Sequence, residues 1–130
     1  MSGLSDYAEL AVINALLRNT ALQVATTYVA LHTSDPTDAA SSTELTDTGY
    51  ARKSASWDAP SQGAGTTQNS ADIDFNAIVD AGPFTITHVS IWDAASGGNM
   101  LLSQALAVSK SFSQNDVPRF PQGSLVVTAS

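Results

Sequence analysis

The sequence predicts a mainly β protein, an antiparallel β-sandwich of jelly-roll-like form with one N-terminal α-helix. Two observations carry this prediction. About six to eight short segments rich in β-branched and aromatic residues alternate with turn signals, and helical periodicity is confined to the start of the chain. The length of 130 residues suits one domain, so we expect a helix at residues 1–19 packed on a sandwich at residues 26–130.

The first segment has the capping residues and the periodicity of a helix. Ser5 or Asp6 can cap its N-terminus, and Asp6 and Glu9 stand at the spacing of a capping box. One apolar stripe at helical spacing follows, formed by Tyr7, Leu10, Ala11, Ile13, Asn14 and Leu17. We therefore expect a helix that ends at Asn19 and Thr20.

Two further apolar residues, Val12 and Leu16, point away from this stripe. A helix that is apolar on both sides needs two partners, and a domain of this size usually offers one. The second side lies either under a loop of the same chain or against a neighbouring subunit. In the second alternative, Leu10 and Leu17 face the parent sandwich. Tyr7, Val12 and Leu16 then form the candidate subunit interface.

The first half of the sandwich is predicted from a change of period to alternation. Residues 27–32 form a strand, and the polar residues 33–38 form a turn with a proline that presets φ. Residues 39–48 are small and polar and predict a loop. Residues 50–57 alternate again as a second strand, and residues 58–70, rich in Gly, Ser, Thr and Gln, predict an exposed loop or irregular edge.

A hairpin at residues 83–102 is the clearest β signal in the chain. A long β-branched strand leads into a turn with Gly97 and Gly98, and an apolar strand returns. Its predicted core residues are Phe84, Ile86, Val89, Ile91 and Leu101. Before it, residues 71–75 form a short strand in which Ile73 and Phe75 face inward.

Three more segments after the hairpin have strand character. Residues 104–112 predict one long or bulged strand, followed by a polar turn at 113–116. Residues 117–120 predict a short edge, because the proline at position 118 argues against a central place in a sheet. Residues 125–128 close the chain as a last strand.

Composition excludes several classes of partner. The formal net charge is −7, from 12 acidic and 5 scattered basic residues, which disfavours nucleic-acid binding. There is no cysteine for disulfides or thiolate metal sites. No apolar run reaches the roughly 20 residues of a membrane span, and the early acidic residues do not suit a signal peptide, so we expect no membrane partner and a cytoplasmic origin. Only 13% of residues are charged, which favours packing against copies or neighbours.

No pattern of residues indicates catalysis or a cofactor. His32 and His88 lie in predicted strands without further ligands at metal-binding spacing, so we expect no metal, no cofactor and stability that does not depend on metal. Asp72 and Asp74 share the wet face of a strand, and no serine stands in a Gly-x-Ser-x-Gly motif. An enzyme is therefore the least supported function.

The aromatic residues offer the one route to ligand binding. Strand residues of this type more often belong to the core than to a ligand platform. Tyr50 and Trp57 are the candidates for contact with a carbohydrate if they are exposed. A carbohydrate-binding module that recognises a host-surface glycan is thus a candidate function of a separate class.

Several motifs occur in one order along the chain. They are YVALHTSDPTD at residues 28–38, GYAR at 49–52, HVSIWDAASGGN at 88–99 and GSLVV at 123–127. Together they resemble small tail-fibre-like or minor tail virion proteins of tailed bacteriophages. Pro118 departs from the pattern, because it interrupts a strand expected to be continuous.

The resemblance implies a non-enzymatic virion structural protein. It implies a tail-fibre or baseplate-associated subunit or adaptor, assembled in the host cytoplasm, with other virion proteins and copies of itself as partners. Fibre-like assemblies are commonly threefold, which favours a trimer. Decoration of the capsid is an alternative that the sequence does not separate from attachment to the tail.

Overall fold

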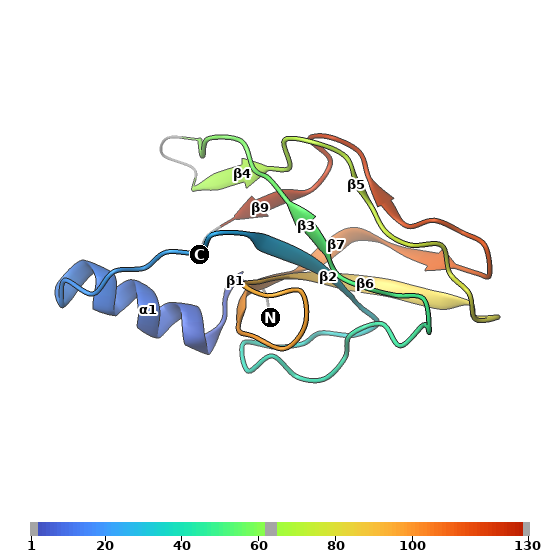
Figure 1. The fold of residues 1–130 in the computed structure, drawn as a ribbon, viewed down its shortest axis with the longest axis horizontal. Helices are drawn as coiled ribbons and strands as arrows, with labels where there is room; N and C mark the ends of the chain where they lie inside the picture. Colours follow the sequence, from blue (N-terminus) through green and yellow to red (C-terminus); the bar gives the residue numbers. More distant parts are fainter. Residues whose placement is uncertain (1–2, 62–64, 129–130) are drawn as a thin grey trace.

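The computed structural model describes residues 3–61 and 65–128, and its strands form one large sheet and two small ones (Figure 1). The large sheet has the order β1-β7-β6-β2-β3, and the small sheets pair β4 with β9 and β5 with β8, all antiparallel. The elements in chain order are β1 (Gly3–Leu4), α1 (Asp6–Leu17), β2 (Thr27–His32), β3 (Lys53–Ala55), β4 (Thr66–Gln68), β5 (Ile73–Asp74), β6 (Phe84–Trp92), β7 (Met100–Phe112), β8 (Arg119–Phe120) and β9 (Val126–Thr128).

The hairpin of β6 and β7 forms the centre of the large sheet, as predicted. Its turn contains Gly97 and Gly98 at φ of 61° and 73°, values that side chains with a Cβ rarely adopt. The register shifts between Ile86 and His88. Because of this irregularity, Ile86 and Val89 both face the core although strict alternation would place them on opposite faces.

β2 lies beside β6 and buries the same face of the sheet. Val29 pairs with Ile91 and Leu31 pairs with Val89, and all four side chains are buried. The predicted core of the hairpin is confirmed: Ile86, Val89 and Ile91 are buried, and Phe84 and Leu101 are half-buried against the core.

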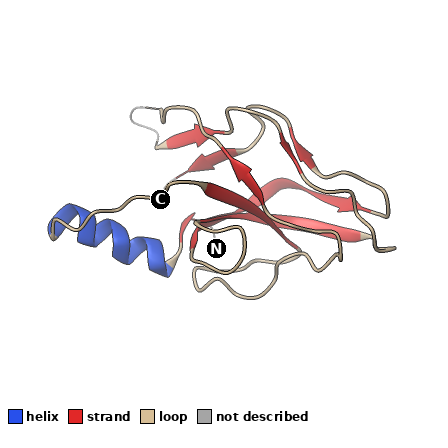
Figure 2. Ribbon diagram, viewed as in Figure 1, coloured by secondary structure: helices blue, strands red, loops and turns tan. Residues whose placement is uncertain are grey.

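The two small sheets cover one face of the large sheet and complete a sandwich (Figures 1 and 2). Their contribution to the core includes Ile73 and Phe75 near β5, Phe120 of β8, and Leu125 and Val127 near the end of the chain. These side chains form one cluster with the inward side chains of β2 and β6. The predicted antiparallel β-sandwich is therefore confirmed.

The amide of Asn69 fixes the second layer from inside. This side chain is fully buried, and its Nδ2 donates to the carbonyl oxygens of Ala71 and Pro121 at 2.9 and 3.0 Å and to that of Phe120 at 3.3 Å. Its Oδ1 accepts the backbone N–H of Leu125 at 2.9 Å. One buried polar side chain thereby satisfies backbone groups from three segments of the chain.

Several element boundaries differ from the sequence prediction. β2 has the predicted bounds, and the two strand segments predicted at 100–102 and 104–112 form the single strand β7. The strand predicted at 50–57 shortens to β3, and the predicted loop at 58–70 contains β4. β1 was not predicted, because two residues are too few to show alternation.

Pro118 lies buried just before β8 and not within a ladder. Its carbonyl oxygen accepts the N–H of Phe75 at 2.9 Å, and pairing continues from Arg119 opposite Asp74 to Phe120 opposite Ile73. At this position only the carbonyl oxygen of Pro118 forms a backbone hydrogen bond, so the missing N–H of proline leaves no gap in the pairing. The proline is therefore compatible with the strand of two residues that follows it.

Helix α1 projects from one end of the sandwich (Figures 1 and 2). Ala8 is its one fully buried residue. The expectation that Leu10 and Leu17 face the sandwich is wrong, since they are 65% and 79% exposed. The predicted apolar stripe is present on the helix, but the helix axis leads away from the sheet (Figure 1). The large side chains of the stripe therefore do not pack into the core that the structure describes. Whether residues 1–130 behave as a single domain stays a prediction.

Candidate interaction site

The base of helix α1 is held firmly on the large sheet. Ser5 is buried, and its Oγ accepts the N–H of Ala8 at 3.1 Å, which caps the helix. The same hydroxyl donates to the carbonyl of Met100, and the Ser5 N–H donates to that of Leu101 at 2.9 Å. Asp6 N–H donates to the carbonyl of Asp38 at 2.9 Å. These bonds fix the direction in which the helix leaves the sheet.

The outer part of helix α1 exposes large aliphatic side chains. Ile13 is 53% exposed and Leu16 is 77% exposed, in addition to Leu10 and Leu17. Residues 18–26 then run back from the far end of the helix towards β2 (Figure 1). A helix whose large apolar side chains face outward while small ones face inward presents a contact surface to other molecules.

The candidate interface residues divide between the two sides of the helix. Tyr7 and Leu16 are exposed, at 45% and 77%. Val12 is half-buried, on the side that also carries Ala8 and Ala15. The exposed face is therefore the stripe that the sequence analysis assigned to the core, with Leu16 beside it.

A second feature of the structure is an ion pair beside the β6–β7 turn, between the buried side chain of Arg52 and the half-buried side chain of Glu44. The guanidinium of Arg52 donates to both carboxylate oxygens of Glu44, at 2.9 and 3.0 Å, and to the carbonyls of Ala94 and Gly97, at 3.0 and 2.9 Å. Its carbon atom Cζ lies 3.8 Å from the ring centroid of Trp92. Arg52 therefore holds the hairpin turn against the loop that contains Glu44.

The carboxylate of Glu44 has a second donor. The Tyr50 hydroxyl donates to Glu44 Oε2 at 2.5 Å and accepts the N–H of Leu31 at 3.1 Å. Burial would raise the pKa of Glu44, but the bonds from Arg52 and Tyr50 outweigh it and lower that pKa. Burial and the bond to Glu44 raise the pKa of Tyr50 far above its ordinary value, so the phenol stays protonated.

A chain of hydrogen bonds runs from the same turn through His32. Trp92 Nε1 donates to Ser90 Oγ at 2.6 Å, and Ser90 Oγ lies 2.6 Å from His32 Nε2. His32 Nδ1 lies 3.0 Å from Thr43 Oγ1, whose hydroxyl donates to the carbonyl of Ser34 at 3.0 Å. Since that hydroxyl proton is committed, the network assigns the proton of the imidazole to Nδ1 and leaves Nε2 as an acceptor.

His32 is a structural histidine in this network. Its side chain is buried, and this burial lowers its pKa to about 4. The groups that would form a metal site are missing around it: among residues 3–61 and 65–128 there is no cluster of three or more His, Cys, Asp or Glu side chains placed to bind a metal ion.

The two aromatic residues considered for carbohydrate contact are not exposed. Tyr50 packs on the core with its ring stacked on Phe75 at a centroid distance of 6.4 Å. Trp57 is half-buried against the core, and its Nε1 donates to Thr27 Oγ1 at 2.8 Å. Stacking on a sugar needs a free ring face in an open site, so neither residue forms such a platform here.

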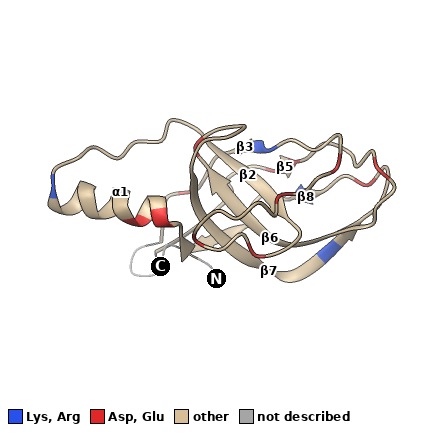
Figure 3. Cartoon of the chain, turned by 90° about the horizontal axis from the view of Figure 1, so that it is seen from below, with Lys and Arg blue, Asp and Glu red and all other residues tan. Residues whose placement is uncertain are grey.

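The charged side chains gather into local pairs and not into a patch. Arg119 pairs with Asp72 and with Asp74, the latter at 3.0 Å, on the exposed side of β5 and β8. The bonds from the Gln122 N–H and from Arg119 lower the pKa of Asp72. In the described part of the chain, the Lys and Arg residues occur at separate places, with Arg52 and Lys53 as the one adjacent pair (Figure 3). No helix there is long and apolar enough to cross a membrane.

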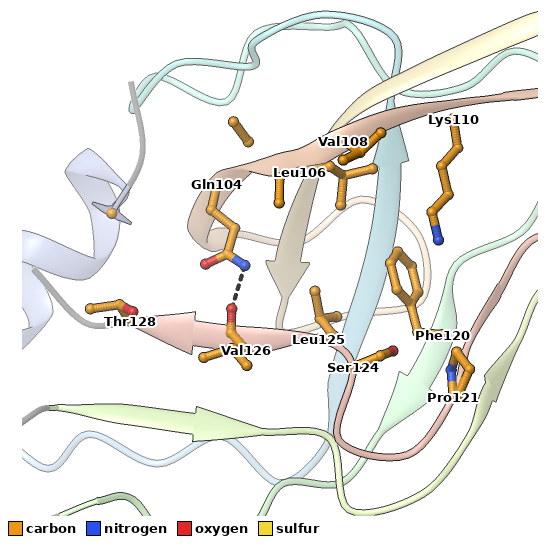
Figure 4. A pocket seen from close by; sticks show the side chains of 13 residues that line it. Gln104, Leu106, Val108, Lys110, Phe120, Pro121, Ser124, Leu125, Val126 and Thr128 are labelled. Carbon is orange, nitrogen blue, oxygen red and sulfur yellow. Dashed lines mark hydrogen bonds between the residues drawn. The ribbon is translucent and has the colours of Figure 1, made fainter.

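A groove of about 800 Å³ runs between β7 and the segment that carries β8 and β9. Figure 4 shows Leu106 and Val108 of β7 facing Phe120 and Leu125 across it. The side chain of Gln104 spans one end and donates to the carbonyl of Val126 at 2.5 Å. The alternation of Gln104, Leu106, Val108 and Lys110 along the predicted strand was the signal that could have revealed this groove from the sequence.

The described residues thus combine a β-sandwich with a projecting helix that exposes apolar side chains and with a largely apolar groove. The sequence matches the family model "Podophage GP4 fiber I protein gp80" over residues 3–128. Because the match spans nearly the whole sequence, the chain belongs to this family of phage tail-fibre-like proteins, and the resemblance seen in the sequence is confirmed. Its role is that of a structural component of the phage fibre and hence of the virion. No curated protein matches the sequence.

Proposed function

We propose that this chain is a non-enzymatic accessory subunit of a podophage tail fibre, joined to the virion and to its own copies through the exposed face of helix α1. The single observation that carries the proposal is the projection of this helix, with Leu10, Ile13 and Leu16 more than half exposed. Aliphatic side chains in such positions favour burial against another protein. Assembly takes place in the host cytoplasm, before the particle is complete.

A trimer is the oligomer we favour. Each chain carries one projecting helix, and a closed ring of copies would cover every helix in the same way. Three copies are favoured because fibre-like assemblies are commonly threefold. The weakly charged composition, with 13% charged residues, supports a chain that is covered by neighbours after assembly.

Sedimentation velocity tests the role of the helix. The change Ile13→Glu with Leu16→Glu places two carboxylates on the proposed contact face, and we expect a folded protein that sediments as a smaller species. The matched control is Val117→Glu, at a valine that is 53% exposed and lies outside the helix. Unchanged sedimentation of the helix variant, or an equal effect of the control, would contradict the proposal.

The location of the chain in purified particles tests the proposal that it is a subunit of the tail fibre. Antibody labelling viewed by electron microscopy should place it on the tail fibres. Labelling spread over the capsid surface would instead assign it to capsid decoration and overturn the fibre role of this chain. The glycan-binding function has no support from the site, since Tyr50 and Trp57 pack on the core.

A further inference from the structure

The apolar surface of this chain is concentrated in two places. Among the described residues, eleven large hydrophobic side chains are at least 36% exposed, and seven of them lie between Tyr7 and Val24, on helix α1 and the segment after it. Two of the remaining four, Val108 and Val126, line the groove between β7 and β9. A contact between the helix and the groove would remove both surfaces from water at once.

We propose that the groove between β7 and β9 receives helix α1 of a second copy of this chain. This inference rests on the proposed function and names the surface that the helix meets. The helix is longer than the groove, which can receive about two of its turns. The helix has 12 residues and is therefore about 18 Å long. Gln104 pairs with Val89 and Lys110 pairs with Ile86, so these two ends of the groove lie about 10 Å apart along the neighbouring strand.

The charges at the two surfaces are complementary. The described lining of the groove contains one ionisable side chain, the cation of Lys110, on a chain whose net charge is −7. The first turn of the helix carries the carboxylates of Asp6 and Glu9. An apolar helix face with acidic residues at one end therefore meets an apolar groove with a basic residue at one end.

A side chain of the same subunit blocks the main alternative occupant. A strand added between β7 and β9 would pair with the free carbonyl oxygens and N–H groups along the edge of one of them. Gln104 Nε2 already takes the Val126 carbonyl at 2.5 Å, across the gap that such a strand would enter. A helix would contact the groove through its side chains and would leave the hydrogen bond between Gln104 and Val126 in place. This favours a helix over a strand as the occupant of the groove.

The contact must form between copies. The base of the helix is fixed by Ser5 and Asp6 to the carbonyls of Leu101 and Asp38, and the helix points away from the sandwich (Figure 1). A helix held in this direction does not fold back onto its own groove. Each copy gives a helix and receives one, an arrangement that two copies satisfy by reciprocal exchange and that three copies satisfy by a closed head-to-tail ring.

Disulfide trapping tests the proposal directly, because the chain has no cysteine of its own. Ile13 lies at the middle of the helix, and Val108 lies near the middle of the groove and is 71% exposed. We expect a mixture of Ile13→Cys and Val108→Cys chains to form covalent dimers under mild oxidation. Their yield should exceed that of an Ile13→Cys and Val117→Cys mixture about tenfold, because the groove contact raises the effective concentration of the thiols. Neither variant alone should cross-link.

Each other outcome overturns the assignment of the groove in a distinct way. Cross-links in the Ile13→Cys variant alone would show that helices of two copies pack against each other. The chain would then self-associate, but the groove would not be part of the interface. Cross-links within Val108→Cys alone would show pairing between strand edges. An intramolecular disulfide in the double variant would show that the helix folds back. A protein that stays monomeric at high concentration would overturn both this inference and the self-association in the proposed function.

Discussion

Acidification should destabilise this protein through one residue, His32, well before its carboxylates respond. The pKa of His32 falls from 6.5 to about 4 on folding because the imidazole is buried. A shift of this size corresponds to a loss of about 3 kcal/mol of the free energy of unfolding. The structure explains the cost: a second proton would enter at Nε2, which already accepts from the Ser90 hydroxyl in the assigned network, so Ser90 would lose its acceptor.

The direction of the stability change and the pH range in which it occurs follow from the unfolded and folded pKa values of His32. Below pH 6.5 the unfolded chain binds a proton at His32 that the folded chain refuses until about pH 4, so stability falls as the pH is lowered through this window. Glu44, whose folded pKa is lowered, contributes stability that is present above its unfolded value of 4.5 and is lost as pH falls further. The two groups therefore act mainly in successive windows, the histidine first.

Urea unfolding between pH 7.5 and 4.5 measures this effect. The free energy of unfolding should fall with a slope that approaches 1 proton, about 1.4 kcal/mol per pH unit, and the melting temperature should fall by roughly 10 °C over the full window. Changing the other histidine, His88→Gln, is the matched control and should leave the slope intact. A stability that is flat between pH 6.5 and 4.5, or one that becomes flat in the control, would refute the role of His32.

Three further predictions follow from packing and charge. Ile91→Ala should cost about 2–5 kcal/mol in chemical unfolding because the site is buried, whereas Val117→Ala at an exposed site should change little; equal effects would contradict the assigned core. Arg52→Ala should cost about 1.5–3 kcal/mol because it leaves the half-buried carboxylate of Glu44 without its cation, and Arg119→Ala, at an exposed pair, should cost clearly less by the same measurement. Calcium, zinc or a chelator should leave the melting temperature unchanged in a thermal scan, since the described residues hold no metal cluster, and a metal-dependent rise would count against this.

The three long strands of the large sheet, β2, β6 and β7, could be predicted because their signals are local. Alternation sets the bounds of β2, and the Gly97–Gly98 turn sets the hairpin of β6 and β7. The direction of helix α1 could not be predicted in this way. Its periodicity correctly marks an apolar face, but the bonds of Ser5 and Asp6 to distant strands and loops decide that this face leaves the sandwich.

The polar cluster of Glu44 and Arg52 beside the β6–β7 turn could not be predicted from the sequence either, because its contacts join distant parts of the chain. Glu44 lies in a segment predicted as a loop and Arg52 in a segment predicted as a strand, and Arg52 binds carbonyl oxygens more than 40 residues away in the hairpin turn. Nothing in the local pattern indicates that His32 is neutral and buried, because burial depends on the pairing of β2 with β6. Such sites depend on contacts that exist only after the sheet has formed.

The bond between Asn69 and Leu125 has a consequence for the order in which the protein folds. It joins positions 56 residues apart. The pairings of β4 with β9 and of β5 with β8 also join distant positions, Thr66 with Thr128 and Ile73 with Phe120, whereas β6 and β7 meet through one short turn. Contacts between distant positions are slower to form than local ones. The hairpin of β6 and β7 can therefore form before the rest of the sandwich, since Tyr28 of β2 pairs with Trp92 and Gly3 of β1 pairs with Ser103 across comparably long or longer stretches of chain. Until residues 119–128 pair with β4 and β5, the hairpin exposes the apolar face that becomes the core.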